Sequence, residues 1–552
     1  MSCARLLGLV EGPPACHHAM TSLDDIATDD IATDDIATDG IATVDIAIDD
    51  TNGRTLRPSI PAPASPSAST AVVLRYPGAL VPVLVSLGML VAVVSSLGAP
   101  LIPTIAAENH VALSSAQWAL TVTMLVGAIA TPVMGRLGDG PHRKRVILTG
   151  LGAVMAGSLL AALPIGFACL LAGRALQGVG MGLVPLAIAT ARDALPPHKA
   201  RSAVATLSLT TAAGIGLGYP ITGLFAEYLG MYAGFWFALA TAVAAFVATV
   251  IVVPAPPHRP TTPMDVPGAL LLAGGMAALL LSLAEGERWG WSSPSLLALA
   301  LAAVLLLAGW VLHSLRSTHP LVRVSLVKDR GVLVANLTTM VGGVGTYLLI
   351  ALVTRYVQTP EAAGYGFGAS IVVTGLLLVP FSAASLLTGR LVRVMGAAAT
   401  PARMLPLGCL LSLAGLVCFL LARSSLWGIG VMMALAGLGV GVTFAVTPGL
   451  IVGGVPAAET GSAMSFNQVV KYIGYSTGSA LSAVVLQAHT APGAALPTND
   501  GYRSAGLVGC AAFLITGVLA VVLTRVGVRA RPSVVAAGQS AAAGASTEPS
   551  RP

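Results

Sequence analysis

The sequence is poor in charged residues. Asp, Glu, Lys and Arg make up only 9% of its 552 residues, whereas hydrophobic residues make up 55%. Soluble chains average about 25% charged residues, so this balance excludes a large soluble protein. The mean hydropathy of +0.85 indicates instead a chain that crosses a lipid bilayer many times.

The sequence also lacks the residue clusters from which catalytic sites and metal centres are built. There is no convincing carboxylate pair, histidine cluster or activated serine, so we expect no enzyme activity and no cofactor. No basic face on a soluble module is visible, so we expect no nucleic-acid partner. Four of the six cysteines fall inside apolar runs, where cysteine behaves as a small hydrophobic residue, so no disulfide framework is implied. They are Cys169, Cys409, Cys418 and Cys510.

From Gly78 onward the sequence alternates between long apolar runs and short polar turns. A run of about 20 apolar residues can cross a bilayer as a helix. We therefore predict an all-α polytopic membrane protein with fourteen transmembrane helices. The predicted spans are 79–104, 114–134, 146–164, 166–190, 203–226, 232–253, 266–284, 295–315, 332–354, 368–388, 404–422, 426–448, 461–487 and 504–526.

The loops between these spans differ in basic residues. One alternate set holds most of the Lys and Arg, whereas the other holds Arg288, Arg355, Arg423 and Arg503. Because Lys and Arg are retained on the cytoplasmic side, this bias predicts that both termini are cytoplasmic. We expect a multi-pass protein of the cell membrane.

Two parts of the sequence repeat weakly. Gly135-Arg136-Leu137 after the second span is echoed by Gly389-Arg390-Leu391 after the tenth. Ser202, Gly214 and Gly218 match Ser462, Gly474 and Gly478 at one constant offset. We infer two six-helix halves with an inserted two-helix hairpin. Duplicated halves place a substrate site at their interface near the bilayer midplane.

The repeat sets the predicted domain limits. The N-terminal half covers 79–253, the linker and hairpin 254–330, and the C-terminal half 331–527. The segment 1–78 contains an Asp-rich pentapeptide repeat and a Pro/Ala/Ser stretch, with too little apolar surface for a core. We expect it, and the segment 528–552, to be disordered cytoplasmic tails.

A basic turn follows the second span. It places Gly135, Asp139, Arg143 and Lys144 at the spacing Gly-x-Leu-x-Asp-x-x-x-Arg-Lys. This turn resembles the signature loop of major facilitator superfamily transporters. The resemblance implies that Asp139 belongs to a charge relay that latches one closed state. Alternatively, Asp139 caps the next helix or is a solvated loop residue.

The fourth span contains Arg174 and, on the same helix face, Gln177. An Arg inside an apolar span costs about 2.5–3.5 kcal/mol on insertion scales, so it is seldom accidental. The stretch from Arg174 to Gly180 resembles the Arg-x-x-Gln-Gly motif of facilitator transporters, in which the Arg faces the cavity and is linked to proton coupling. The structural alternative is an Arg tied to backbone carbonyls.

The fifth span carries Gly214, Gly218, Pro220 and Gly223. Glycines at this spacing allow close helix packing, and an internal proline bends a helix. The stretch resembles the fifth-helix motif Gly-x-x-x-Gly-Pro-x-x-Gly-Gly, which separates antiporters from importers in the superfamily. The match is imperfect, because Tyr219 stands between Gly218 and Pro220.

The thirteenth span has a polar face. Asn467, Lys471 and Tyr475 recur every four residues, so they lie on the same side of the predicted helix. Lys471 either extends its ammonium toward the bilayer surface or lines the central cavity. These two alternatives stay open at the level of sequence.

The resemblance covers residues 79–527 and implies a fourteen-span drug–proton antiporter. It would export lipophilic drugs or antibiotics by alternating access, driven by the proton gradient and acting as a monomer. One departure matters: Val94 stands where such antiporters carry a first-span Asp, so no proton carrier is assigned. The alternatives are a facilitator or importer of a small metabolite on the same fold, and a non-transporting membrane sensor.

Overall fold

The computed structural model describes residues 76–97, 101–255, 263–323, 329–395, 400–491, 494 and 496–528. All of them belong to one compact unit, Ala68–Pro552. The two predicted tails lie outside the described residues, apart from 76–78 and 528. The predicted domain limits stay predictions.

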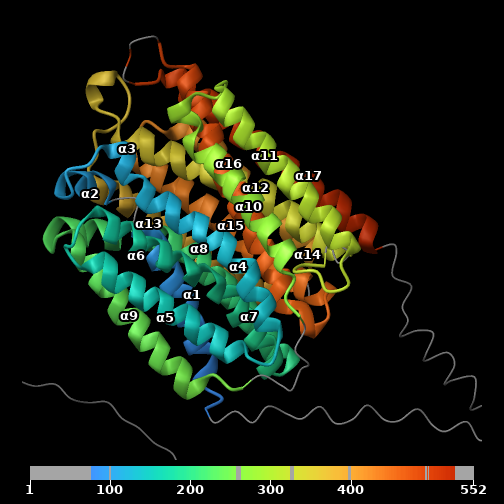
Figure 1. The fold of residues 1–552 in the computed structure, drawn as a ribbon. Coiled ribbons are helices and arrows are strands. Elements are labelled where there is room, and N and C mark those ends of the chain that lie inside the picture. Colours follow the sequence, from blue (N-terminus) through green and yellow to red (C-terminus); the bar gives the residue numbers. More distant parts are fainter. Residues whose placement is uncertain are drawn as a thin grey trace, which may run out of the picture. The chain divides into compact units, whose positions relative to one another are not determined.

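The described residues form α-helices and short 3₁₀ helices, without a strand. The long helices run roughly alongside one another (Figure 1). The helices are α1 (Leu80–Ser96), α2 (Ile102–Glu108), α3 (Leu113–Ala116), α4 (Trp118–Asp139), α5 (Arg143–Ala162), α6 (Phe167–Val179), η1 (Gly180–Gly182), α7 (Leu183–Ala194), α8 (Pro197–Tyr228), α9 (Met231–Val252), α10 (Val266–Trp289), α11 (Pro294–Arg316), α12 (Arg330–Gln358), η3 (Glu361–Ala363), α13 (Ile371–Met395), α14 (Pro401–Ala422), α15 (Leu426–Gly454), η5 (Ala457–Glu459), α16 (Thr460–Ala488) and α17 (Asn499–Val528).

The apolar runs coincide with helices. Among the described residues, twelve helical segments are long and apolar enough to cross a membrane. Two further predicted spans coincide with α8 and with α1, which has 17 residues. The prediction of one helix over 79–104 is wrong: α1 ends at Ser96, and a separate α2 begins at Ile102 with a proline in its first turn. The fourth span is likewise divided, by η1, into α6 and α7.

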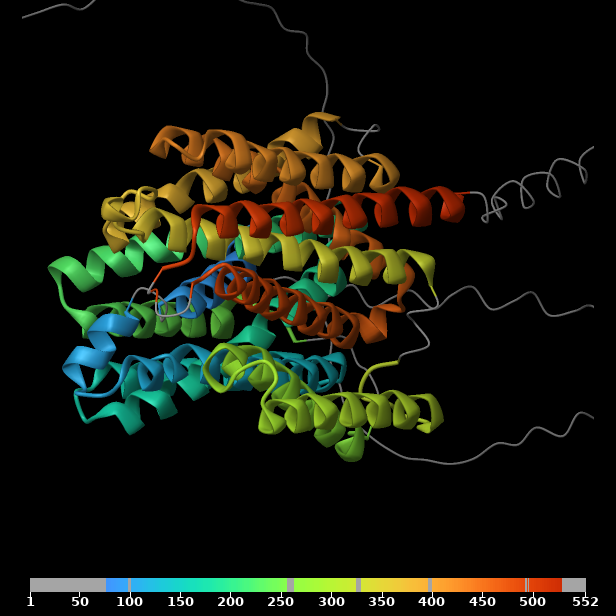
Figure 2. The same cartoon turned by 90° about the horizontal axis from the view of Figure 1, so that it is seen from above.

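The helices form two groups. The N-terminal group contains α1 to α9, and the C-terminal group contains α12 to α17 (Figure 2). The groups meet where α8 packs against α13 and α15, and where α16 packs against α4 and α7. The contact of α4 with α16 is called the junction below. Its two helices come from segments more than 300 residues apart, so the junction ties the two groups together.

The repeated glycines make the same kind of contact in both groups. In the N-terminal group, Gly218 of α8 packs against Ser96 of α1, with no room for a Cβ. In the C-terminal group, Gly478 of α16 packs against the backbone of Val344 in α12, where a Cβ would come within 2.9 Å of the carbonyl carbon. Small residues let helix backbones approach closely in lipid, so the weak sequence repeat corresponds to a repeated packing contact.

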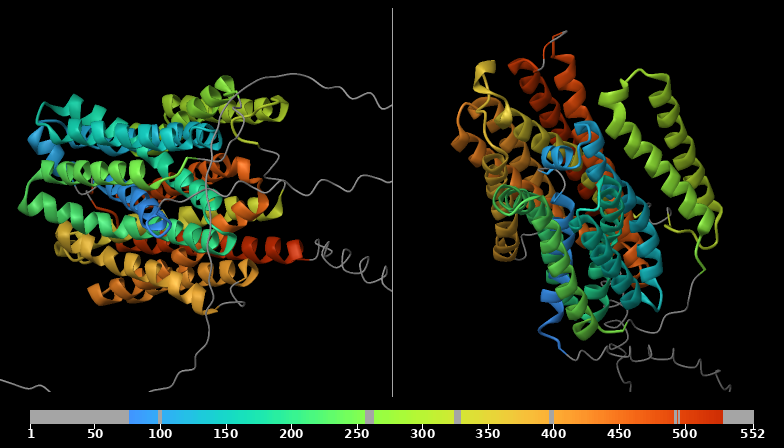
Figure 3. Two further views of the ribbon diagram at one scale, coloured as in Figure 1. Left: turned by 90° about the horizontal axis from the view of Figure 1, so that it is seen from below. Right: turned by 60° about the vertical axis from the view of Figure 1, so that its left-hand side comes forward.

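Helices α10 and α11 form a hairpin at one side of the bundle (Figure 3, right). Its base is held by Asp265, which caps α10 by accepting a hydrogen bond from the Gly268 amide at 3.0 Å. The same carboxylate lies 2.7 Å from Nε2 of His313 and accepts a bond from the Leu321 amide at 3.1 Å. Burial raises the pKa of Asp265, but these three partners outweigh it and hold the pKa below its usual value.

The hairpin contacts both groups. Helix α10 packs against α4 and against α16. From α11, the buried ring of Trp310 stacks on Phe466 of α16, with 6.0 Å between the ring centroids. The predicted inserted hairpin therefore covers the side of the junction.

Candidate functional site

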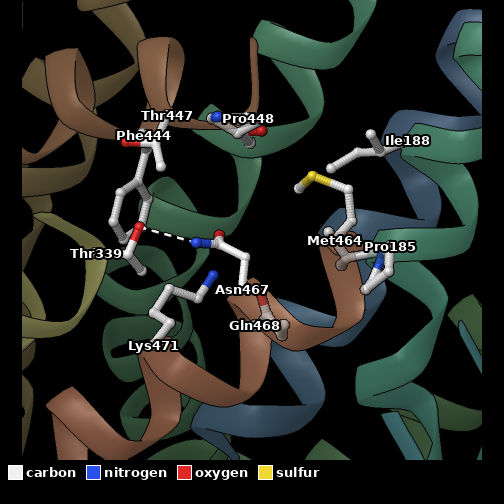
Figure 4. Close-up of a pocket in the computed structure, with 12 residues that line it drawn as sticks. Pro185, Ile188, Thr339, Phe444, Thr447, Pro448, Met464, Asn467, Gln468 and Lys471 are labelled. Atoms are coloured by element: carbon white, nitrogen blue, oxygen red, sulfur yellow. Dashed lines mark hydrogen bonds between the residues drawn. The ribbon is translucent and has the colours of Figure 1, made fainter. Parts of the chain in front are cut away.

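A small cavity lies between the two groups. Its volume is ≈ 30 Å³, enough for a water molecule or two but far below the 300–1,000 Å³ typical of ligand pockets. The structure therefore has the site in a closed form. Figure 4 shows the residues that line it. The lining comes from α7, α8, α12, α15 and α16: Val184, Pro185, Ile188, Ser208, Thr339, Phe444, Thr447, Pro448, Met464, Asn467, Gln468 and Lys471.

Lys471 lines this cavity and does not extend to the bilayer surface. Its side chain is buried, with 7% of the residue exposed. The ammonium Nζ lies 5.0 Å from the centroid of the Phe444 ring, a cation–π contact. The sequence left open whether Lys471 extends to the bilayer surface or lines the cavity, and its position here is the second of these. What Lys471 does there stays a prediction.

The polar face of α16 lies against α12. Nδ2 of Asn467 donates hydrogen bonds to Oδ1 of Asn336 and to Oγ1 of Thr339, both at 3.1 Å. The ring of Tyr475 stacks on that of Tyr347, with centroids 4.2 Å apart. Asn467, Lys471 and Tyr475 thus share one face, as their spacing predicts.

Three residues of this site were not predicted from the sequence: Asn336, Thr339 and Phe444. Asn336 was the easiest of the three to predict, because a polar amide inside an apolar span is costly and indicates a polar partner nearby. Phe444 carried no signal, since an aromatic residue in an apolar run is ordinary. Gln468, the neighbour of Asn467, also lines the cavity and donates to the Tyr472 hydroxyl at 2.7 Å.

Arg174 is fully buried inside the N-terminal group and is not among the residues that line the cavity. Its Nε donates to the Ala119 carbonyl of α4, and its Nη1 donates to the Val94 carbonyl of α1, both at 3.0 Å. Nη1 also donates to Oε1 of Gln177 at 2.7 Å. In this conformation Arg174 has the geometry of the structural alternative, an Arg tied to backbone carbonyls. Its role in coupling stays a prediction.

Gln177 extends the same network to a further helix. Its Nε2 donates to Oγ of Ser158 in α5 at 3.0 Å. The Thr123 hydroxyl of α4 in turn donates to the Arg174 carbonyl at 3.0 Å. The Arg174 network therefore joins α1, α4, α5 and α6. The Nη2 atom of Arg174 has no hydrogen-bond partner among the described residues.

Asp139 bridges the junction. Its Oδ1 accepts from the Gly461 amide at 2.7 Å, and its Oδ2 accepts from the Ser462 amide at 2.9 Å. A carboxylate at a helix N-terminus satisfies free N–H groups and meets the positive end of the helix dipole. Asp139 therefore caps a helix, as one alternative proposed, but the helix is α16 of the other group and not the next helix in the chain.

The other residues of the basic turn divide between the junction and the N-terminal group. Gly135 packs on α16: a Cβ there would lie 2.6 Å from Cβ of Ser465. Arg143 pairs with Asp193 at 2.6 Å. Lys144 donates to the Val250 carbonyl at the end of α9 at 2.9 Å. Thus Gly135 and Asp139 hold α16, whereas Arg143 and Lys144 bind within their own group.

Arg192 adds a second bridge that the sequence analysis missed. From the end of α7 it donates to Oγ1 of Thr460 at 2.6 Å and to the Val455 carbonyl at 3.0 Å. Arginine is common in the cytoplasmic loops of membrane proteins, so nothing in the local sequence indicated that Arg192 has partners in the other group. Together, Asp139 and Arg192 close the two groups at the end where α16 begins.

The glycines of the fifth-span motif face two ways. Gly214 and Gly218 pack on α1 against Ala92 and Ser96. Pro220 faces α13, where a Cβ on Gly375 would lie 3.0 Å from the Pro220 nitrogen.

Gly223 has a looser contact. A Cβ on it would lie 3.5 Å from Cγ2 of Val372, again in α13. Helix α8 continues through Pro220 to Tyr228 as one element. Pro220 and Gly223 therefore lie where α8 meets α13 of the other group, whereas Gly214 and Gly218 face α1.

Residues 84–479 match the family described as Major Facilitator Superfamily, which covers more than half of the chain. The chain belongs to this superfamily. Its two helix groups, with a cavity between them, are the arrangement that duplicated transporter halves adopt.

The relatives of this facilitator include proteins named as exporters. The chain is 29% identical over 423 residues to the "Tetracenomycin C resistance and export protein" of Streptomyces glaucescens, covering 72% of this chain and 74% of the relative. It is 27% identical over 400 residues to the "Probable actinorhodin transporter" of Streptomyces coelicolor, covering 69% and 67%. It is 28% identical over 400 residues to the "Multidrug resistance protein Stp" of Mycobacterium tuberculosis, covering 70% and 72%.

A solved structure shares the fold. The facilitator superimposes on the human organic anion transporter MFSD10 (TETRAN) with a TM-score of 0.57 at 19% identity, covering 80% of this chain and 99% of the other. The protein is a multi-pass membrane transporter of the major facilitator superfamily. Two of these relatives are named for resistance, one to tetracenomycin C and one to multiple drugs.

Proposed function

We propose that this facilitator exports lipophilic drugs or antibiotics by alternating access, coupled to proton influx across the cell membrane. The names of its relatives support export of such compounds. The observation that carries the proposal is the position of the cavity. Its lining comes from α7 and α8 on one side and from α12, α15 and α16 on the other, so separation of the groups would enlarge it.

The proposed motion would open and close the junction. Asp139 holds α16 through two backbone hydrogen bonds, and Gly135 lets the helices touch. Hydrogen bonds to backbone amides form and break without rearranging a packed core, which suits a gate. In this proposal Arg143 and Lys144 shape the turn that presents Asp139.

The remaining predicted site residues have proposed roles in the same cycle. Arg174 and Gln177 would act in proton coupling, while Asn467, Lys471 and Tyr475 would form the cavity wall. Of the fifth-span residues, Gly214 and Gly218 would let α8 slide along α1. Pro220 and Gly223 would let it bend and slide against α13. Both termini would lie in the cytoplasm, and the transporter would act as a monomer.

Transport into proteoliposomes would test this proposal. The full-length protein is reconstituted in liposomes that contain a pH-sensitive dye, and a pH gradient is imposed. Two lipophilic fluorescent probes, one cationic and one anionic, are added in turn. Proton movement that starts on addition of either probe, with accumulation of that probe abolished by a protonophore, would support proton-coupled antiport.

A second candidate function on the same fold, passive facilitation or import of a small metabolite, follows from the same cavity. None of the residues that line it is a carboxylate, so no acidic proton carrier lies there. Equal probe accumulation with and without the pH gradient would favour this candidate and contradict proton-driven export.

A further inference from the structure

Lys471 is a buried basic residue without a charged partner. The residue is 7% exposed, and among the described residues no carboxylate forms an ion pair with it. Its nearest favourable contact is the face of the Phe444 ring at 5.0 Å. Figure 4 shows its nitrogen near Thr339 and Asn467, beside the cavity.

A charged group in this position is costly. An ammonium has three N–H donors and loses most of its hydration on burial, and a ring face replaces only part of that loss. Buried charges in proteins are normally paired or hydrogen-bonded. Lys471 therefore lies ready for an anionic partner that enters the cavity.

The other polar groups around the cavity do not offer this partner. Asn467 donates to Asn336 and Thr339, and the hydroxyls of Ser208 and Thr447 donate to carbonyls of their own helices. Lys471 is the one charged residue in the cavity lining. The cavity thus has positive charge and no negative charge.

The rest of the wall is apolar and partly aromatic. Phe444 contributes a ring face. Ile188 contributes a branched apolar side chain from the N-terminal group, and Met464 contributes a flexible one from the C-terminal group. Such a wall favours a flat hydrophobic body beside the charged end of a ligand.

We propose that this cavity is a binding site for lipophilic anions, in which Lys471 pairs with the acidic group of an aromatic compound and Phe444 packs on its ring system. This inference rests on the proposed transport function and names the charge of its substrates. Lipophilic cations are excluded by the same lysine, because the cavity lining holds no carboxylate to pair with them.

Binding of three matched probes would test the inference. The full-length protein in lipid nanodiscs is titrated with 2-naphthoate, 2-naphthylmethanol and 2-naphthylmethylammonium, which share one ring system and differ in charge. Empty nanodiscs give the blank. We expect the anion to bind at least tenfold more tightly than the cation, with the alcohol between them.

Variants of Lys471 test whether this residue causes the preference for the anion. Lys471→Gln is expected to weaken binding of the anion at least tenfold and to leave the alcohol unchanged, whereas Lys471→Arg retains the anion preference. Lys199→Gln removes the same charge from an exposed position on α8 and is expected to change nothing. Thermal unfolding of each variant reports folding, and Lys471→Gln is expected to unfold at the same or a higher temperature because it removes an unpaired charge.

Several outcomes would overturn the inference. They are equal affinity of the wild type for anion and cation, no binding of the anion, or an unchanged anion affinity in Lys471→Gln. The transport assay separates this failure from failure of the proposed function. Proton-driven transport of the cationic probe alone would leave export standing and remove anion selectivity, whereas no transport of either probe would count against export itself.

Discussion

Asp139 and Gly461 are 322 residues apart in the chain, yet Oδ1 of the first lies 2.7 Å from the amide nitrogen of the second. The carboxylate ends α4 and caps α16, so one side chain joins the two helix groups. The contact is buried, with 6% of Asp139 exposed. The strength of the junction can therefore be changed at a single position.

Replacing Asp139 should loosen the junction. Hydrogen bonds to a charged group contribute about 1.5–3 kcal/mol, so we expect Asp139→Ala to shift the equilibrium toward an open junction by roughly tenfold or more. The measurement is thiol labelling of Ser465→Cys, a fully buried position at the junction, in a parent without native cysteines. Labelling should be faster in the double variant than in Ser465→Cys alone.

Ser482→Cys serves as the control for this measurement. It is also fully buried in α16 but lies more than four helical turns away from Ser465. Its labelling should stay slow when Asp139 is changed. Equal acceleration at both positions would indicate general loosening of the protein and would contradict a local role for Asp139.

A methyl group on Gly135 should push the junction apart. A Cβ there would lie 2.6 Å from Cβ of Ser465 and 2.8 Å from the Gly461 carbonyl oxygen, so Gly135→Ala should cost about 1–3 kcal/mol through overpacking. Gly152→Ala in α5 is the matched control, because nothing lies within 4 Å of its new Cβ. That control should be neutral or stabilising by up to about 1 kcal/mol, since Ala favours helix.

Thermal unfolding and probe transport of these two glycine variants provide the check. Gly135→Ala should unfold at a lower temperature and transport more slowly than the wild type. If it behaves like Gly152→Ala in both assays, then α4 and α16 do not need the close approach seen here.

Arg174→Lys should destabilise the N-terminal group. A lysine keeps the charge but has one nitrogen, so it cannot serve the carbonyls of Ala119 and Val94 as the planar guanidinium does. Each lost bond should cost about 1.5–3 kcal/mol. The measurement is thermal unfolding in detergent micelles, with Arg201→Lys as the control because Arg201 is exposed.

Stability and coupling can then be separated for Arg174. Proton flux is measured well below the unfolding temperature of either variant. Loss of coupled flux in Arg174→Lys without any loss of stability would assign Arg174 to coupling and would contradict the tie to backbone carbonyls.

The hairpin base should be sensitive to acid. Because the folded pKa of Asp265 lies below its usual value of 3.8, its ionised form stabilises the fold above that value, and this stabilisation is lost as the pH falls through the folded pKa. Asp265→Asn should lower the unfolding free energy at pH 7 by about 0.5–2 kcal/mol, typical of a weakened helix cap.

Unfolding of wild type and Asp265→Asn at pH 7 and pH 3 gives the test. The difference between the two proteins should shrink at pH 3, which lies below the usual pKa of 3.8, because the unfolded chain then binds the proton and the advantage of the ionised form falls. Asp500→Asn, at an exposed position, is the control. A difference that is the same at both pH values would show that the charge of Asp265 does not stabilise the hairpin.

Much of the architecture could be predicted from apolar runs and basic loops, because lipid demands long helices with satisfied backbones. The break after Ser96 was harder to foresee. Pro100 and Pro103 stand there, but prolines also occur inside continuous helices of this protein, such as Pro220 in α8. Local sequence does not tell these cases apart, since neighbouring helices decide whether a proline is accommodated.

The site was predictable in part. The four-residue spacing placed Asn467, Lys471 and Tyr475 on one face, but only the position of α12 and α15 decides that this face is buried. The partner of Asp139 could not be predicted from the sequence, because a carboxylate that binds backbone amides requires no particular side chain at Gly461 or Ser462. Arg174 could be identified from its charge inside an apolar span. Its carbonyl partners could not be predicted, because every residue has a backbone carbonyl.

The hairpin of α10 and α11 limits how the two groups can move. Helix α10 packs against α4 and α16, and Trp310 stacks on Phe466, so the hairpin holds a member of each group. It cannot travel rigidly with both if they separate. If the groups rock as proposed, the hairpin has to slide along one of them or leave it, so its contacts oppose a wide opening.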